Sequence, residues 1–264
     1  MLTRSLAVLI FLFSLPIKAE SLAPHRECVL VADLNSGKTI LQQGDGFCDE
    51  RLSPNSSFKI ALALMAFDSG ALTSKDEILK WDGKKQPLES WEHDTNAERW
   101  LKESVVWFSQ RLTPKIGLAN IESYLKTFRY GNQNFSGGLT KAWLMSTLKI
   151  SAREQVEFLR RARLNDLKIA EKATDTVMTI LPVEVNRPGL RISGKTGSGS
   201  SWENEKDLQN PNPYQVGWYI GYAEKNSKAY AFAAVLTDKV NRGEFASSGK
   251  IAKEMAIKAI EGLK

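Results

Sequence analysis

The chain has 264 residues, of which 42% are hydrophobic and 25% are charged, and its formal net charge at pH 7 is +6. This is an ordinary globular composition, and the length suits one large domain or two interleaved subdomains. The basic residues are neither clustered nor interleaved with aromatic residues, so the charge is a weak indication of nucleic-acid binding. A solvated surface accounts for the basic excess more simply than attraction to anionic small molecules or to a cell-wall surface.

The first 19 residues have the pattern of a secretory signal peptide. A short basic start at Arg4 precedes the apolar run from Leu6 to Phe13, and Lys18-Ala19 offers a small residue for cleavage. The run is too short to span a bilayer, although an uncleaved anchor is the alternative. We expect cleavage after Ala19 and a mature protein in the periplasm without stable membrane association. Losing two basic residues and no acidic one lowers the charge from +6 to +4.

The two cysteines, Cys28 and Cys48, both lie in the expected mature chain. A cysteine pair in an exported protein usually forms a disulfide, which here would stabilise the fold by about 3 kcal/mol. A zinc site would need more ligands, and His25 and His93 do not have metal-ligand spacing. We therefore expect a disulfide and no metal.

Strand patterns occupy the start of the mature chain and helical patterns its middle. Alternating apolar and polar residues predict a strand, a turn containing Gly37 and a second strand over residues 28–43. An apolar helix is expected over 56–69, with Gly70 after its end. Residues 73–181 are mostly helical in pattern. They contain a capping box at Ser151 and Glu154, and turns are expected at Thr113-Pro114, Tyr130-Gly131-Asn132 and Ser136-Gly137-Gly138.

Strand patterns return over residues 189–199, 214–224 and 228–238, and an amphipathic helix over about 249–263 ends the chain. This order predicts an α+β fold, an α/β sandwich in which strands from both ends form one antiparallel sheet. The terminal helix would cover one face and the helix at 56–69 the other. A mixed subdomain would comprise about 20–60 and 182–264, and a helical subdomain about 61–181. A catalytic cleft would lie between the two.

Ser56 and Lys59 are three residues apart at the start of the apolar helix, which places both side chains on one face of its first turn. The run from Ile60 to Phe67 is apolar on all sides, so the helix should be buried. Burial lowers the pKa of a lysine, and a neutral amine can accept a proton from a serine or react with carbon dioxide to form a carbamate. Taken alone, the pair also fits a helix-start serine beside a snorkelling lysine.

A second motif, Lys195-Thr196-Gly197, stands at the end of a predicted strand. Lys195 and Thr196 could bind a carboxylate, and Gly197 would let a substrate approach the backbone. An ordinary strand end followed by a glycine turn is the alternative.

Ser-x-x-Lys followed much later by Lys-Thr-Gly is the signature of the penicillin-recognising serine enzymes. Within that superfamily the chain resembles the class D, oxacillinase-type, β-lactamases over essentially the whole mature sequence. The motifs that carry the resemblance occur in the family's order: "SPNSSFK", "WDGKK", Ser104-x-Val106, Tyr130-Gly131-Asn132, Trp143 in "KAWLMSTLKIS", "GKTGSG" and "GWYIGYAE". The resemblance implies the β-lactamase/transpeptidase-like fold.

The resemblance also implies roles for individual residues. Ser56 would be the nucleophile that forms an acyl-enzyme. Lys59, carbamylated with carbon dioxide or bicarbonate, would be the general base for Ser56 and for the deacylating water. Trp143 would donate its indole N–H to the carbamate, and Ser104 would relay a proton to the leaving nitrogen. Val106 would keep the pocket apolar, although core packing explains it equally well.

On the substrate side, Lys195 and Thr196 would bind the carboxylate, beside Gly197. The backbone N–H groups of Ser56 and Ser198 would form the oxyanion hole. Many family members carry an arginine near the start of the last helix, and that position falls near Ser248 in this chain. Either Arg242 from the preceding loop or Ser248 would complete the anchor. Tyr130-Gly131-Asn132 is expected to shape the cleft wall.

These features favour a periplasmic β-lactamase that hydrolyses small-molecule β-lactams, including penicillins of the oxacillin type. The alternatives are a D,D-peptidase of the same fold and a β-lactam sensor that acylates without turnover. Nothing supports a Ser-His-Asp triad. The polar segment "SSWENEKDLQNPNPYQ" with Trp202 is expected to border the cleft and tune substrate choice. The sequence sets neither substrate breadth nor whether the protein is a monomer or a homodimer.

Overall fold

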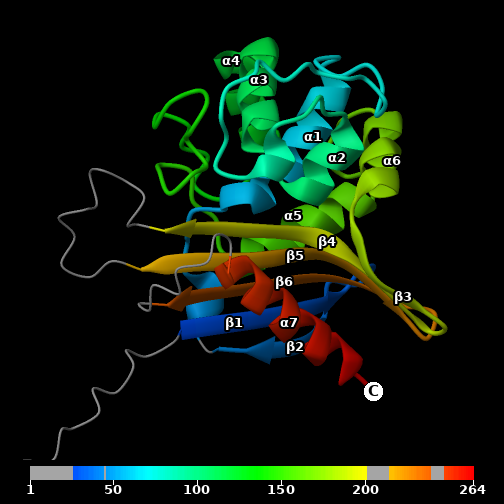
Figure 1. Cartoon of the computed structure of the whole chain (residues 1–264). Helices are drawn as coiled ribbons and strands as arrows, with labels where there is room; N and C mark the ends of the chain where they lie inside the picture. The colour runs from blue at the N-terminus through cyan, green and yellow to red at the C-terminus, as the bar shows by residue number, and fades with distance from the viewer. Residues whose placement is uncertain (1–25, 45, 201–213, 239–246) are drawn as a thin grey trace, which may run out of the picture.

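The computed structural model describes residues 26–44, 46–200, 214–238 and 247–264. Their strands form one six-stranded antiparallel sheet in the order β2-β1-β6-β5-β4-β3, shown in Figure 1. The predicted sheet, which combines strands from both ends of the chain, is therefore confirmed. The strands are β1 (Arg26–Asp33), β2 (Thr39–Gln43), β3 (Val183–Arg187), β4 (Leu190–Ser200), β5 (Gln215–Lys225) and β6 (Lys228–Asp238).

The predicted turn between β1 and β2 contains Gly37. Its φ is 72°, a left-handed conformation that glycine adopts without steric cost. The short edge strand β3 was not predicted. It pairs only with β4, and four of its five residues are exposed. Apolar and polar residues alternate only from Val183 to Asn186, which is the shortest run that indicates a strand in sequence.

The helices of the described residues lie on both faces of the sheet. They are α1 (Lys59–Asp68), α2 (Ala97–Glu103), α3 (Val106–Ile116), α4 (Leu118–Phe128), α5 (Ala152–Arg163), α6 (Glu171–Ile180) and α7 (Ser247–Glu261), with short 3-10 turns η1 (Phe47–Asp49), η2 (Asn55–Phe58) and η3 (Glu89–Trp91).

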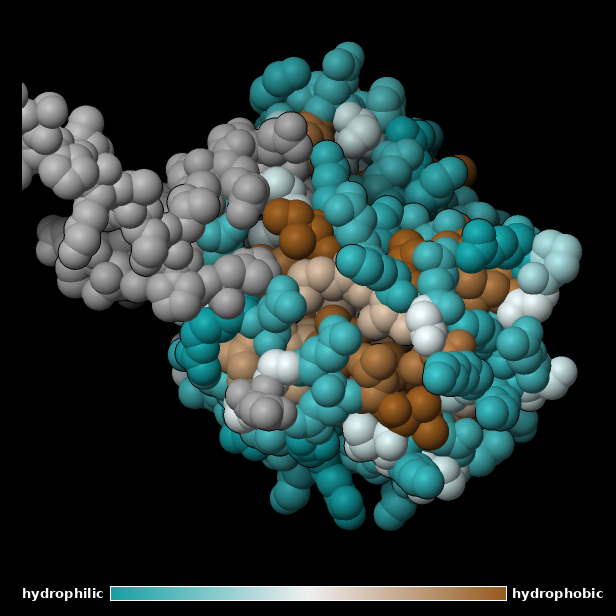
Figure 2. Space-filling model, turned by 90° about the horizontal axis from the view of Figure 1, so that it is seen from below, coloured by the Kyte–Doolittle hydropathy of each residue, from teal (hydrophilic) through white to brown (hydrophobic). Residues whose placement is uncertain are grey.

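The terminal helix α7 covers one face, as predicted, and packs against β4, β5 and β6. Ala252, Ala256 and Ile260 of α7 belong to the same buried cluster as Val31 and Phe232 of the sheet. Figure 2, which views the molecule from below, shows apolar side chains gathered within a largely hydrophilic surface. On this side the partly buried side chains of β2 and α7 continue the cluster outward.

The prediction that the helix beginning near Ser56 covers the other face is wrong in detail. That face is covered by α5 and by the turn η2, while α1 packs chiefly against α3 and α6 inside the helical half. The reason lies in the sequence of α1: eight of its ten residues are buried, so it has no polar side to turn to solvent. Helix α5 is amphipathic and begins with the predicted capping box at Ser151 and Glu154.

The turn predicted at Thr113-Pro114 is also absent, because α3 continues through Pro114 to Ile116. Proline in a last helical turn removes only one N–H donor. The helix ends instead at Gly117, whose φ is 86°. Glycine rather than proline therefore sets this boundary.

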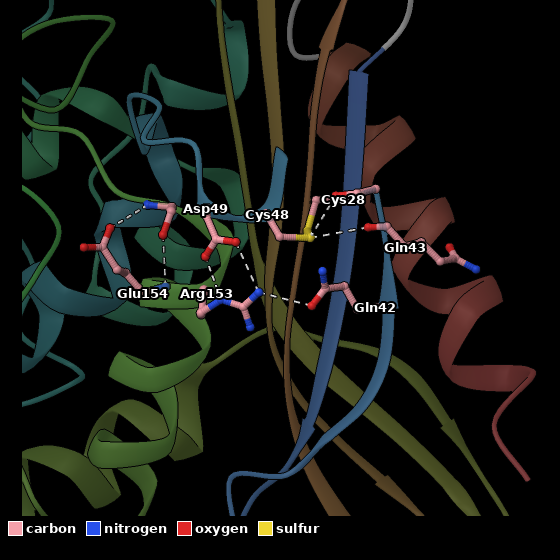
Figure 3. The surroundings of a disulfide bond; sticks show 9 residues. Cys28, Gln42, Gln43, Cys48, Asp49, Arg153 and Glu154 are labelled. Atoms are coloured by element: carbon pink, nitrogen blue, oxygen red, sulfur yellow. Dashed lines mark hydrogen bonds and ion pairs between the residues drawn. A yellow bond between two sulfur atoms is a disulfide. The ribbon is translucent and has the colours of Figure 1, made fainter. Parts of the chain in front are cut away.

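The predicted disulfide joins Cys28 of β1 to Cys48 of η1 (Figure 3). Beside it, Arg153 of α5 donates to Asp49 at 2.6 Å, which fastens η1 to the helix behind it. Within the part of the chain that the structure describes, no helix is both long and apolar enough to cross a membrane.

Candidate active site

Ser56 and Lys59 are brought together by a tight turn that leads directly into a helix. Ser56 lies in the 3-10 turn η2, and Lys59 is the first residue of α1. Residues three apart superimpose in a 3-10 turn, so both side chains project to the same side. The Nζ of Lys59 donates to the Oγ of Ser56 at 2.9 Å. The Lys59 side chain is fully buried, whereas Ser56 is partly accessible.

The electrostatics of this pair favour an uncharged lysine. Burial places the pKa of Lys59 well below its usual value, and the nearby positive charge of Lys195 lowers it further. Burial also lowers the pKa of Lys195, to about 7. A neutral amine has a free electron pair, so Lys59 can accept a proton or react as a nucleophile.

Asn55, directly before Ser56, ties the turn to a distant segment around Trp143. Asn55 has φ 49° and is 1% exposed. Its N–H donates to the carbonyl of Trp143 at 2.9 Å, and its Oδ1 accepts from the N–H of Met145 at 3.1 Å. Its Nδ2 donates to the carbonyl of Ser53 at 3.3 Å. These bonds set the position of Ser56 relative to Trp143. No sequence signal indicated the bonds to Trp143 and Met145, because these partners lie about ninety residues from Asn55.

Trp143 carries a polar group with no partner in a fully buried environment. Its ring packs against Phe58 and Phe135, with centroids at 5.6 and 6.0 Å. Its Nε1 is buried and has no hydrogen-bond partner in the described structure. A buried donor without an acceptor costs roughly 1–3 kcal/mol, and such groups are rare. The indole N–H therefore marks a place where an additional hydrogen-bond acceptor would be stabilised.

Strand β4 packs closely against the turn η2. A Cβ at Gly197 would lie 2.6 Å from the carbonyl oxygen of Pro54 and 2.8 Å from the N of Ser57, distances that no side chain tolerates. A Cβ at Gly199 would lie 2.5 Å from Oδ1 of Asn55. Glycine at both positions lets the strand reach the turn that carries Ser56.

The remaining residues of β4 present polar groups at this edge. Lys195 is 2% exposed, and its Nζ donates to the carbonyl of Thr196 at 3.0 Å and approaches its Oγ1 at 3.3 Å. Thr196 and Ser198 are partly accessible. The Oγ of Ser198 accepts from the N–H of Gly249 at 2.9 Å, which joins β4 to the start of α7.

Ser104 stands at the junction between two helices. It is the C-cap of α2 and has φ 62° and ψ 32°, a left-handed conformation that is unusual for a residue with a Cβ. Val106 begins α3, and both residues are partly accessible. Arg129 and Asn165 also have left-handed backbones, so this conformation by itself assigns Ser104 no role, and the proton relay stays a prediction.

Three predicted residues remain, of which the structure describes Ser248 alone. Ser248 is 3% exposed and donates its hydroxyl proton to the carbonyl of Val216 at 3.0 Å, so that proton is already used. Arg242 and Trp202 lie outside the described residues.

Tyr130 was expected in the cleft wall but is fully buried, because its ring packs edge-on against Phe58 and Phe158. Its hydroxyl accepts from Gln155, which also donates to Ser57 at 3.2 Å. Gln155 was not singled out in the sequence, since a glutamine within a capping-box helix gives no indication of its partner.

The chain is similar to known proteins over most of its length. Residues 28–257 match the family model described as the penicillin binding protein transpeptidase domain. The chain is 38% identical over 216 residues to β-lactamase OXA-9 of Klebsiella pneumoniae, covering 78% of this chain and 77% of that protein. It is 37% identical over 243 residues to β-lactamase OXA-1 of Escherichia coli, covering 89% and 84%.

The crystal structure of the OXA-427 class D β-lactamase has a TM-score of 0.77 and 35% identity to the chain, covering 89% of this chain and 97% of that one. The chain belongs to the class D β-lactamase family. This confirms the family expected from the motifs. In this chain, the Ser-x-x-Lys motif at η2 and the Lys-Thr-Gly motif of β4 lie against each other.

Proposed function

We propose that the protein is a serine β-lactamase, and that its nucleophile is Ser56. The hydrogen bond from a buried lysine to this hydroxyl, at 2.9 Å, is the observation that carries the proposal. Ser56 attacks the lactam carbonyl, the C–N bond of the ring breaks, and an ester to Ser56 forms. Water then cleaves the ester and releases the opened product. β-Lactamases at 37% and 38% identity over most of the chain support this reaction class.

Proton transfer to and from Ser56 requires a base in the buried pocket. Two observations fit a carbamate on Lys59: the amine is held in a setting that favours its neutral, reactive form, and the indole N–H of Trp143 lacks an acceptor. Such a carbamate, formed from carbon dioxide or bicarbonate, supplies an anionic general base for Ser56 and for the deacylating water. Trp143 holds and orients it, and Val106 limits water around it. Ser104 passes a proton to the leaving nitrogen.

The substrate carboxylate and the developing oxyanion need separate positive partners. Lys195 and Thr196 bind the carboxylate, because a buried ammonium next to a hydroxyl offers charge-assisted hydrogen bonds. The backbone N–H groups of Ser56 and Ser198 bind the oxyanion. Of the two residues expected to add to the carboxylate anchor, Arg242 is the one proposed, because the hydroxyl of Ser248 donates to the carbonyl of Val216. Penicillins of the oxacillin type are the proposed substrates.

The first test is a penicillin-hydrolysis time course on the purified mature protein, with and without added bicarbonate, beside the Lys59→Ala variant. We expect sustained turnover that bicarbonate raises and that Lys59→Ala abolishes. A single stoichiometric acylation of Ser56 without turnover would indicate a sensor or a D,D-peptidase instead and would refute the proposed hydrolysis.

Export is proposed from the first 19 residues, which read as a cleavable signal peptide that delivers the enzyme to the periplasm. An intact-mass measurement on the exported protein tests this. A mass that begins at residue 20 or within a few residues of it supports cleavage, and a mass that includes Met1 contradicts it.

A further inference from the structure

The side chain of Trp91 spans the junction that carries Ser104. Its Nε1 donates to the carbonyl of Glu103 at 2.9 Å, directly before Ser104. Its own carbonyl accepts from the Nε1 of Trp107 at 2.7 Å, near the start of α3. Trp91 therefore holds the end of α2 with one group and the start of α3 with another. It is 4% exposed, so these contacts lie away from solvent.

The junction needs such a brace because the conformation of Ser104 is unfavourable by itself. At a helix end, the left-handed residue is usually glycine, because glycine has no Cβ to clash with the backbone. The N–H groups of Ser104 and Val105 both donate to the carbonyl of Trp100, so both N–H groups of the junction have an acceptor. The carbonyl of Glu103 is one of the last four of α2, which have no donor within the helix. The indole of Trp91 supplies that donor.

We propose that Trp91 is a positioning residue for Ser104: by bonding both helices at the junction, it holds the Ser104 hydroxyl where the proton relay needs it. The inference rests on the proposed function, since it assumes that Ser104 takes part in turnover. Proton transfer depends on sub-ångström placement, so a relaxed junction should slow the chemical step more than it weakens substrate binding.

The test compares Trp91→Phe, Ser104→Ala and the double variant, by kcat and KM for a penicillin in saturating bicarbonate. Phenylalanine keeps an aromatic ring, and it removes the indole donor together with part of the ring volume. Trp81→Phe is the matched control, because the Nε1 of Trp81 donates to the carbonyl of Lys84 in its own exposed segment and not to α2 or α3. Thermal unfolding of every variant confirms that it is folded.

We expect Trp91→Phe to lower kcat about tenfold with KM changed less than threefold, as the loss of one hydrogen bond allows. The double variant should be no slower than Ser104→Ala alone, because both changes act on the same step. Trp81→Phe should leave kcat unchanged. If Trp91→Phe is unstable, Trp107→Phe removes the other half of the brace and should give the same pattern.

Two results would overturn the inference. One is a wild-type kcat in the folded Trp91→Phe protein. The other is a double variant slower than Ser104→Ala by the full Trp91→Phe factor, which would make Trp91 a general structural residue. Absence of turnover in the wild type would instead refute the proposed function, and full activity of Ser104→Ala would refute the role of Ser104.

Discussion

Asn55 gives a sharp test of how the turn before the nucleophile is built. Its side chain makes two hydrogen bonds to backbone groups, at 3.1 and 3.3 Å, and a weak third to the sulfur of Met145 at 3.5 Å; the site is buried, and the backbone of Asn55 has φ 49°. Replacing it with glycine removes these bonds but permits the backbone. At about 1 kcal/mol for each bond to the backbone, Asn55→Gly should lower the free energy of unfolding by about 2 kcal/mol. For a chain of this size that corresponds to a drop in Tm of about 4–8 °C.

Asn55→Ala loses the same bonds and also forces a Cβ into the left-handed region. That strain costs about 1–2 kcal/mol, and the lower chain entropy of unfolded alanine offsets about half of it. Alanine should therefore be less stable than glycine by about 0.5–1 kcal/mol. Differential scanning calorimetry measures the order of the two variants directly.

A control at Asn120 should give the opposite order. This residue lies within α4 and donates from Nδ2 to the carbonyl of Ile116 at 2.8 Å, so its backbone is helical. Alanine is favoured over glycine there by about 1 kcal/mol. If Asn55→Ala is as stable as Asn55→Gly, or more stable, while the control behaves as expected, the inference that Asn55 has a left-handed backbone is refuted.

Three further predictions concern the site and the covalent link. Trp143→Phe removes an unpartnered donor, so the free energy of unfolding should change by less than about 1 kcal/mol, while the bicarbonate concentration for half-maximal turnover rises; unchanged turnover would contradict the role of the indole. Lys195 has a folded pKa of about 7, below its unfolded value, so the unfolded chain binds more protons between pH 7 and about 10 and the free energy of unfolding should increase with pH across that window. Urea unfolding at pH 7 and pH 9 should show a smaller increase for Lys195→Met, and the KM for penicillins should rise above pH 7 as the ammonium is lost; a pH-independent KM would argue against Lys195 as the anchor. Reducing the Cys28–Cys48 bond should lower the free energy of unfolding by about 3 kcal/mol, and equal Tm values with and without reductant would show that the bond contributes nothing.

The parts of the fold that the sequence revealed are those with local or strongly periodic causes. The central strands, α7 and the capping box at Ser151 follow from alternation, amphipathicity and cap chemistry, each of which acts within a few residues. The meeting of Ser56 and Lys59 likewise follows from a spacing of three. The edge strand β3 and the surroundings of α1 could not be predicted in this way, because they depend on which neighbour each segment finds.

The same distinction applies to the site. Local motifs predicted the proposed reacting residues, whereas the residues that hydrogen-bond around them could not be predicted. Asn55, Gln155 and Trp91 matter through hydrogen-bond partners in other segments, and nothing in their own neighbourhoods identifies those partners. An asparagine before a serine, a glutamine in a helix and a tryptophan in a polar stretch are all common. Only the folded arrangement shows that Asn55 and Gln155 bond the segments around the turn that carries Ser56, and that Trp91 bonds the end of α2 before Ser104.

Gly197 illustrates how a motif can be explained in two ways. In the sequence it suggested room for a substrate beside the strand. In the structure a Cβ there would lie 2.6 Å from the carbonyl oxygen of Pro54, within the polypeptide itself. The nearer obstacle is thus the turn that carries Ser56, and adding a methyl group would displace that turn before any substrate arrived. A loss of activity in Gly197→Ala would therefore report on the position of the nucleophile. For the same reason, the Lys-Thr-Gly motif constrains the placement of Ser56 as well as the binding of the carboxylate.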